Sequence, residues 1–222
     1  MCNHHWYGDA MSIFEIISII VGIAILSSFG FSHDAFAGAN SVICDGTIDG
    51  EIINSNVIVP SGKICDIVDS TINGDVTVEK NASLFVIYSP VINGNLKAQF
   101  AKSIHIQELR LYGNLIMINN EVVLIRDGTG IYGESIIKGN EFFGSDESSY
   151  YGNAKIVQNE VVYIADITLH QNISVINNDS VNGEGIYGEP VFVHGNSICT
   201  QNGELNDTSF VVLGKNNGCP VE

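Results

Sequence analysis

The amino-acid sequence predicts an all-β fold, a parallel β-helix of about seven coils, each of about 19–20 residues with three short strands. Two columns of small residues recur at this interval, and apolar residues alternate with polar ones between them. A fixed period of about 20 residues is typical of stacked repeats, and period-two alternation is typical of strands. The first column consists of Ser55, Gly74, Gly94, Gly113, Gly133, Gly152, Gln171 and Gly188.

The second column lies seven residues after the first and is rich in Asn. Asn and Gly accept the left-handed backbone conformation that tight turns need. An Asn side chain can also hydrogen-bond to the same residue of the coils on either side, so we expect a structural turn ladder. Its predicted members are Asn81, Asn120, Asn140, Asn159, Asn178 and Asn196.

Three groups of apolar positions in each repeat predict the strands. They lie two and four residues after the first column, ten and twelve residues after it, and two residues before its next member. Three strands joined by turns would close a triangular tube in which like side chains stack from coil to coil. The register is poorest at residues 142–149, which we expect to leave the tube as a loop.

The N-terminal segment predicts export. Residues 13–31 are almost wholly apolar, and Ala35-Phe36-Ala37 fits the small-x-small pattern of a signal-peptidase site. No Lys or Arg precedes the apolar run, and an uncleaved membrane anchor is the alternative, since an apolar run of roughly 19 residues could span a bilayer. We expect a secreted protein at the cell surface or outside it, divided into a signal peptide (1–37), an N-terminal cap (38–54), a β-solenoid (55–196) and a C-terminal cap (197–222).

Four cysteines remain after the predicted signal peptide, and they favour two disulfides. Cys44 and Cys65 are separated by about one coil, and so are Cys199 and Cys219. Stacked coils would bring the partners within the distance that a disulfide spans. A zinc site is the weaker alternative, because close Cys-x-x-Cys pairs are absent from the sequence. The two bridges would staple the ends of the tube.

The net charge of the chain restricts which kinds of partner it can bind. The chain has 9 Lys and Arg against 25 Asp and Glu, a formal net charge of −16. Nucleic acids and anionic membranes attract basic surfaces, so we expect neither as a partner, apart from membrane contact through an uncleaved N-terminal segment. Cell-surface glycans or envelope proteins fit better, and self-association is a further possibility.

A column of acidic residues precedes the first column by five positions. One interpretation is a solvated turn edge that discourages pairing between tubes. The other is a stripe of oxygen ligands for a divalent cation, with Ca²⁺ as the candidate. The residues concerned are Asp69, Glu108, Asp127, Glu147 and Asp166, with Ser89 at the remaining step.

Sequons and catalytic patterns add little. Asn172 and Asn206 are the candidates for glycosylation, because each begins an Asn-x-Ser/Thr sequence outside the predicted turn ladder. We expect no catalytic residues, since no Ser-His-Asp or Cys-His pattern stands out. A polysaccharide-degrading enzyme would need carboxylates that flank a cleft.

The repeated segments at residues 72–78 and 92–98, with Asn at the turn, resemble right-handed parallel β-helix proteins. More narrowly, the chain is similar to small secreted prokaryotic β-solenoids with Cys-stapled ends, and more distantly to the bactofilins. This resemblance implies a single-stranded, right-handed helix. It favours a structural or adhesive module of the cell envelope or extracellular matrix that binds partners or glycans through flat faces. A carbohydrate-active β-helix enzyme and a filament-forming solenoid are the alternatives.

Overall fold

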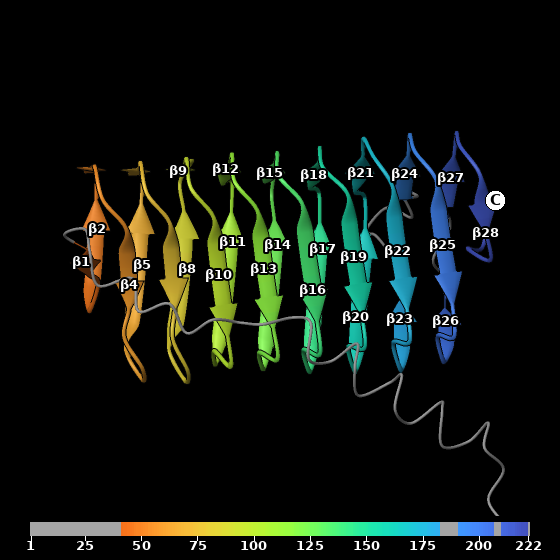
Figure 1. Cartoon of the computed structure of the whole chain (residues 1–222), viewed down its shortest axis with the longest axis horizontal. Helices are drawn as coiled ribbons and strands as arrows, with labels where there is room; N and C mark the ends of the chain where they lie inside the picture. Colours follow the sequence, from red (N-terminus) through yellow and green to blue (C-terminus); the bar gives the residue numbers. More distant parts are fainter. Residues whose placement is uncertain (1–40, 183–190, 207–209, 222) are drawn as a thin grey trace, which may run out of the picture. The chain divides into compact units, whose positions relative to one another are not determined.

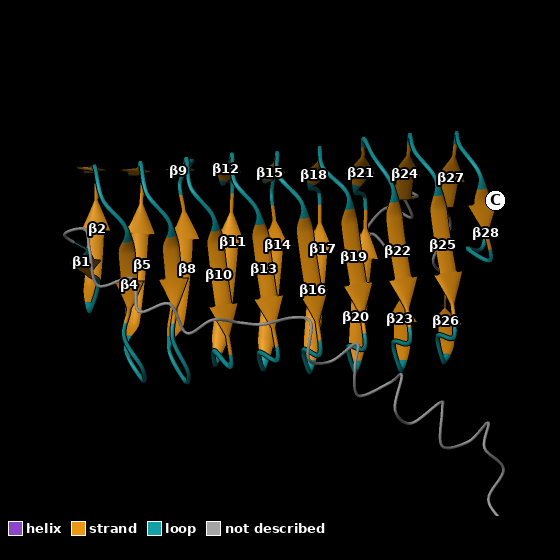
Figure 2. Ribbon diagram, viewed as in Figure 1, coloured by secondary structure: helices purple, strands orange, loops and turns teal. Residues whose placement is uncertain are grey.

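The computed structural model describes residues 41–182, 191–206 and 210–221. Every regular element among these residues is a β-strand, and the strands form three parallel sheets wound into a solenoid of about nine turns (Figures 1 and 2). The predicted fold class is confirmed. The predicted signal peptide lies outside the described residues.

Sheet A has ten strands, and successive members are separated in sequence by one strand of each other sheet. The pairing is in register, so Leu96 lies between Val76 and Leu115. Its strands are β1 (Val42–Ile43), β4 (Val57–Val59), β7 (Val76–Val78), β10 (Leu96–Gln99), β13 (Leu115–Ile118), β16 (Ser135–Lys138), β19 (Ala154–Val157), β22 (Ile173–Ile176), β25 (Ser197–Thr200) and β28 (Asn216–Asn217).

Sheet B has nine strands, most of them five residues long. Alternate residues face the interior, as in β14, where Val123 and Ile125 are fully buried. Its strands are β2 (Gly46–Asp49), β5 (Ile64–Val68), β8 (Ser83–Ile87), β11 (Ser103–Gln107), β14 (Val122–Arg126), β17 (Phe142–Asp146), β20 (Val161–Ala165), β23 (Ser180–Asn182) and β26 (Glu204–Asn206).

Sheet C has nine strands of two or three residues. Each strand contributes one or two residues that face the interior. Ile92 and Leu111 are two such residues from successive coils. Its strands are β3 (Ile52–Ile53), β6 (Thr71–Ile72), β9 (Val91–Ile92), β12 (Arg110–Leu111), β15 (Gly130–Ile131), β18 (Ser149–Tyr150), β21 (Thr168–Leu169), β24 (Val191–Val193) and β27 (Phe210–Val212).

The tube has about nine turns where the sequence predicts seven coils. Strands β1 to β3 lie within the segment predicted as an N-terminal cap, and β25 to β28 lie within the predicted C-terminal cap. Both groups pair in register with the neighbouring coils, as Cys199 does with Val175. The repeat pattern underestimates the number of coils because the side chains of the end coils depart from it while their backbones follow the same path.

The prediction that residues 142–149 leave the tube as a loop is wrong. Phe142–Asp146 is strand β17, and it pairs with both β14 and β20. The alternation is hidden there because Gly144 occupies an outward position and Ser145 an inward one. The Ser145 hydroxyl is buried and lies 2.7 Å from the Tyr150 hydroxyl, so its polar group is satisfied within the core.

The predicted register also fails near the C-terminal end. Leu169 pairs with Val193, and a Cβ atom on Gly195 would meet the backbone of Gln171, so Gly195 continues the first column. Gly188, the member predicted from the sequence, lies outside the described residues. Equivalent positions of these two coils, Asn172 and Asn196, are 24 residues apart, since residues 183–190 stand between β23 and β24.

Three kinds of corner close each coil. At the corner between sheets C and A, a Cβ atom on Gly113 would overlap the carbonyl group of Gly94, so this close approach requires Gly. At the corner between sheets A and B, Asn side chains form a buried ladder, in which Asn120, Asn140, Asn159 and Asn178 are each 1% exposed. From Asn140 onward, each Oδ1 accepts two bonds of 2.9–3.0 Å, from the backbone N–H and the side-chain amide of the preceding member.

Two predicted members of that ladder lie elsewhere. Asn202 follows Asn178, whereas Asn196 belongs to an exposed series with Asn172 at the corner between sheets C and A. Asn81 is exposed and takes the left-handed conformation, with φ of 60°. The extra residues before β24 shift the count and explain the misassignment of Asn196.

Two disulfides staple the ends, as predicted. Cys44 bonds to Cys65 with a Cα–Cα distance of 5.5 Å, and Cys199 bonds to Cys219 with a Cα–Cα distance of 4.7 Å. All four residues are buried. Each bridge joins neighbouring coils at one end of the described stack, which opposes fraying of those coils.

Candidate functional site

A column of stacked aromatic rings lies at the corner between sheets C and A. The rings belong to the residue that follows each of five consecutive sheet C strands: Tyr112, Tyr132, Tyr151, His170 and His194. Successive ring centroids are 4.8, 4.5, 4.4 and 5.3 Å apart, and the interplanar angles are 17°, 2°, 4° and 8°. The spacing matches that of neighbouring strands, so the backbone sets the stacking. We call these five residues the aromatic column.

The aromatic column is open to solvent. Tyr112 is 49% exposed, Tyr132 40% and Tyr151 38%, and both histidines are exposed. Each ring covers the face of its neighbour, so the ring edges, with their hydroxyl and imidazole groups, are what a ligand can reach. The result is a straight row of hydrogen-bonding groups at an almost constant interval.

Residues around the column fix the rings and tune the phenols. A Cβ atom on Gly130 would lie 3.6 Å from the Tyr132 ring and 3.8 Å from the Tyr151 ring, so both rings lie close to the backbone of β15. Desolvation by the stack raises the pKa of the Tyr132 hydroxyl above its usual value, and the neighbouring phenols add to this, whereas Arg110 opposes it. A phenol is protonated at neutral pH at its ordinary pKa, so the Tyr132 hydroxyl can donate to a ligand there.

The same positions carry amides in the earlier coils. Asn73 donates through its side chain to Asn54 at 2.6 Å, and Asn93 donates to Asn73 at 2.7 Å. The corner thus changes from an amide ladder to a ring ladder at Tyr112. Both arrangements place hydrogen-bonding groups at the spacing of the coils, but the rings reach further from the backbone.

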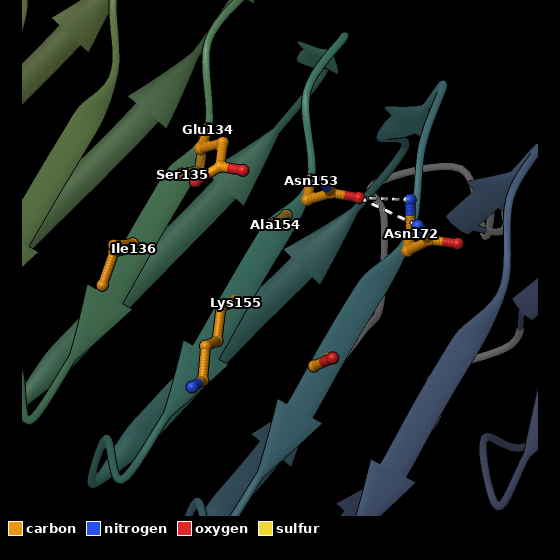
Figure 3. Close-up of a pocket in the computed structure, with 8 residues that line it drawn as sticks. Glu134, Ser135, Ile136, Asn153, Ala154, Lys155 and Asn172 are labelled. Carbon is orange, nitrogen blue, oxygen red and sulfur yellow. Dashed lines mark hydrogen bonds between the residues drawn. The ribbon is translucent and has the colours of Figure 1, made fainter.

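A shallow hollow of about 250 Å³ lies on sheet A, beside the corner that carries the aromatic column. Figure 3 shows the residues that line it. It begins two residues after the ring positions, at Glu134, and crosses strands β16, β19 and β22. An exposed lysine and an exposed isoleucine stand on its surface, as does a serine. The lining residues are Glu134, Ser135, Ile136, Asn153, Ala154, Lys155, Asn172 and Ser174.

Glu134 interrupts a second, exposed hydrogen-bonded series along this corner. Its own N–H donates to Asn114 Oδ1 at 2.8 Å, and the series resumes where Asn172 donates to Asn153. Among the described residues the single ion pair joins Lys63 and Asp45 at 2.6 Å, so the charges of Glu134 and Lys155 are available to a ligand. The hollow therefore combines one carboxylate, one ammonium group and an apolar surface beside the rings.

The predicted acidic column lies at the corner between sheets B and C. Its members share a left-handed backbone, with φ between 42° and 59°, a conformation that Asp accepts more readily than most residues. Ser89 donates to the Glu108 carboxylate at 3.0 Å. No three His, Cys, Asp or Glu side chains in the described part of the chain are grouped so that they could hold a metal ion. The members of this column, with Ser89, are Asp69, Ser89, Glu108, Asp127, Glu147 and Asp166.

The two glycosylation candidates differ in setting. Asn172 is exposed, but its amide nitrogen donates to Asn153 Oδ1 at 2.9 Å and its oxygen accepts from Asn196 at 3.0 Å. A glycan on Asn172 would replace part of that series. Asn206 is the last residue of β26.

The sequence interpretation missed the aromatic column. Its signal was present, because Tyr112, Tyr132, Tyr151 and His170 all precede a member of the first column by one residue.

Comparison of the chain with protein-family models, with curated proteins and with solved structures gives no match. Among the described residues, no helix is long and apolar enough to cross a membrane.

Proposed function

We propose that the protein is a secreted, non-catalytic β-solenoid that binds hydroxyl-rich polysaccharides along the aromatic column and serves as an adhesive or structural module. The observation that carries this proposal is the row of five stacked, exposed rings at spacings of 4.4–5.3 Å. A polysaccharide offers hydroxyl groups at regular intervals along its chain. A rigid row of phenols and imidazoles can hydrogen-bond to it repeatedly with little loss of conformational entropy.

Rigidity supports this role. The buried Asn ladder, the register of three sheets and the two terminal disulfides hold the column at fixed spacing, and preorganisation raises affinity by reducing the entropy lost on binding. The hollow beside the rings supplies a carboxylate and an ammonium group that would select among sugar units. The disulfides are consistent with an oxidising, extracellular location.

The proposal is tested by co-sedimentation with insoluble polysaccharides, using cellulose, chitin and bacterial cell-wall glycan as probes. We expect the wild-type protein to bind at least one of them, and the variant Tyr132→Ser/Tyr151→Ser to bind at least tenfold more weakly, because the centre of the row is lost. The matched control is Tyr88→Ser, which changes an exposed tyrosine outside the column.

Two outcomes would contradict the proposal: no polysaccharide binds the wild type, or the double variant binds as well as the control. Far-UV circular dichroism of each variant checks that the solenoid persists. New reducing ends released from a bound polysaccharide would instead favour the enzymatic alternative.

A further inference from the structure

The outer face of sheet B has an apolar centre. Leu124 on β14, Phe142 on β17 and Val161 on β20 point outward and are half-buried, and Phe142 pairs directly with Val161. A Cβ atom on Gly144 would lie 2.8 Å from Leu124 Cδ2 and 3.0 Å from a ring carbon of Phe142, so both side chains lean over that position. The three strands therefore present a strip of apolar and aromatic side chains along the tube axis, which includes the half-buried Tyr163 level with Gly144.

Carboxylates border this strip on both sides. Each of the three strands begins directly after one acidic residue and ends directly before another, and all six are exposed. Before the strands stand Glu121, Glu141 and Glu160, whose backbone N–H groups bond to successive coils. After the strands stand Asp127, Glu147 and Asp166, in left-handed turns. Arg126, the last residue of β14, and Asp146, the last residue of β17, carry opposite charges that partly cancel.

Asp146, the last residue of β17, places a further carboxyl at the edge of this face. Partial burial raises the pKa of the Asp146 carboxyl, the nearby Asp166 raises it further, and Arg126 acts in the opposite direction. A second copy of this chain would bring carboxylates against carboxylates, and an anionic membrane would be repelled. An occupant of the apolar strip must therefore be basic at both of its edges.

The dimensions select the shape of that occupant. Six residue steps separate each pair of bordering acids, and at about 3.3 Å per residue the strip is roughly 20 Å wide between the carboxylate columns. An α-helix with its side chains is about 10–12 Å across. A helix lying along the tube axis would cover the apolar centre, and its flanking Lys or Arg side chains would span the remaining distance to each column.

We propose that the outer face of strands β14, β17 and β20 is a docking surface for a basic amphipathic helix of a partner protein. Apolar side chains of the helix pack on Leu124, Phe142 and Val161, and its basic flanks pair with the two carboxylate columns. This surface lies on a different face from the aromatic column, so the two sites operate independently.

The test uses a synthetic helical peptide of Leu and Lys, arranged so that the leucines form one face, with binding to the purified full chain measured by fluorescence anisotropy. A peptide of the same composition in scrambled order and a Leu–Glu peptide serve as probes of shape and charge. We expect the amphipathic Leu–Lys peptide to bind most tightly, and its affinity to fall as salt rises.

Matched variants separate the two contributions. Glu141→Gln/Glu160→Gln should weaken binding roughly five- to tenfold, whereas Asp49→Asn/Glu51→Gln, with the same change of net charge in the first coil, should leave it unchanged. Leu124→Asn should weaken binding about tenfold, whereas Ile198→Asn, at an exposed position of sheet A outside the hollow, should not. Circular dichroism confirms that each variant is folded.

The proposal is overturned if the scrambled or the acidic peptide binds as tightly as the amphipathic one. It is equally overturned if both members of a variant pair change the affinity alike, since the contact would then lie elsewhere or depend on net charge alone.

Discussion

Replacing Asn140 by Ala should destabilise the solenoid strongly. The Asn140 side-chain oxygen accepts 2.9 Å bonds from the backbone N–H and the side-chain amide of Asn120, and its amide donates to Met117 O at 3.2 Å and to Asn159 Oδ1 at 2.9 Å. The variant leaves two buried donors of Asn120 without that acceptor. An unsatisfied buried polar group costs about 1–3 kcal/mol, so we expect a loss of about 2–6 kcal/mol.

The matched control is Asn114→Ala. Asn114 Oδ1 accepts one bond of 2.8 Å from the Glu134 N–H at an exposed position, where water can take its place. We expect a loss of about 1 kcal/mol or less for this variant. For a chain of this size the loss from Asn140→Ala corresponds to a fall in Tm of about 5–20 °C, which urea unfolding and thermal melting both measure. Equal losses in the two variants would refute the assignment of the buried ladder as the main polar support of the tube.

Two further predictions concern the ends and the pH response. Reducing the Cys44–Cys65 and Cys199–Cys219 bridges should cost about 3 kcal/mol each and expose the terminal coils first, so limited proteolysis that began in central coils would contradict it. Burial, with a smaller effect of Arg126, lowers the pKa of His105 from 6.5, so the unfolded state binds the proton more tightly and stability falls as pH drops below 6.5. His105→Gln should reduce this loss in urea titrations between neutral and mildly acid pH, and an unchanged pH response would refute the cause.

The repeat and the disulfides could be derived from the sequence because both depend on spacing alone. One full repeat of the pattern returns the chain to the same point of the triangle, so Cys44 and Cys65 become neighbours whatever fills the coil between them. The strands of the end coils could not be derived from spacing in this way. Strand β28 reads Asn216-Asn217, and no alternation marks it, yet it pairs with Ser197 and Ile198 of β25.

The candidate site could not be derived in the same way. Tyr132 and Tyr151 share a position in the repeat, but their stacking at 4.5 Å also depends on the side-chain rotamers, which the sequence does not record. Only one acidic border of sheet B forms a clear column in the sequence. Glu121, Glu141 and Glu160 directly follow the Asn ladder, and the fold is needed to place them opposite the other border across a strand.

The sequence by itself determined the class of fold, the length of a coil, most of the inward positions and the partners of the four cysteines. Periodic burial needs only a regular alternation of residue types, which a single chain records. Tertiary structure alone decided which outward side chains meet, because neighbours in the tube come from successive coils and their contacts depend on register, rotamer and the size of the residue beside them. The aromatic column and the bordered apolar face both arise at that level.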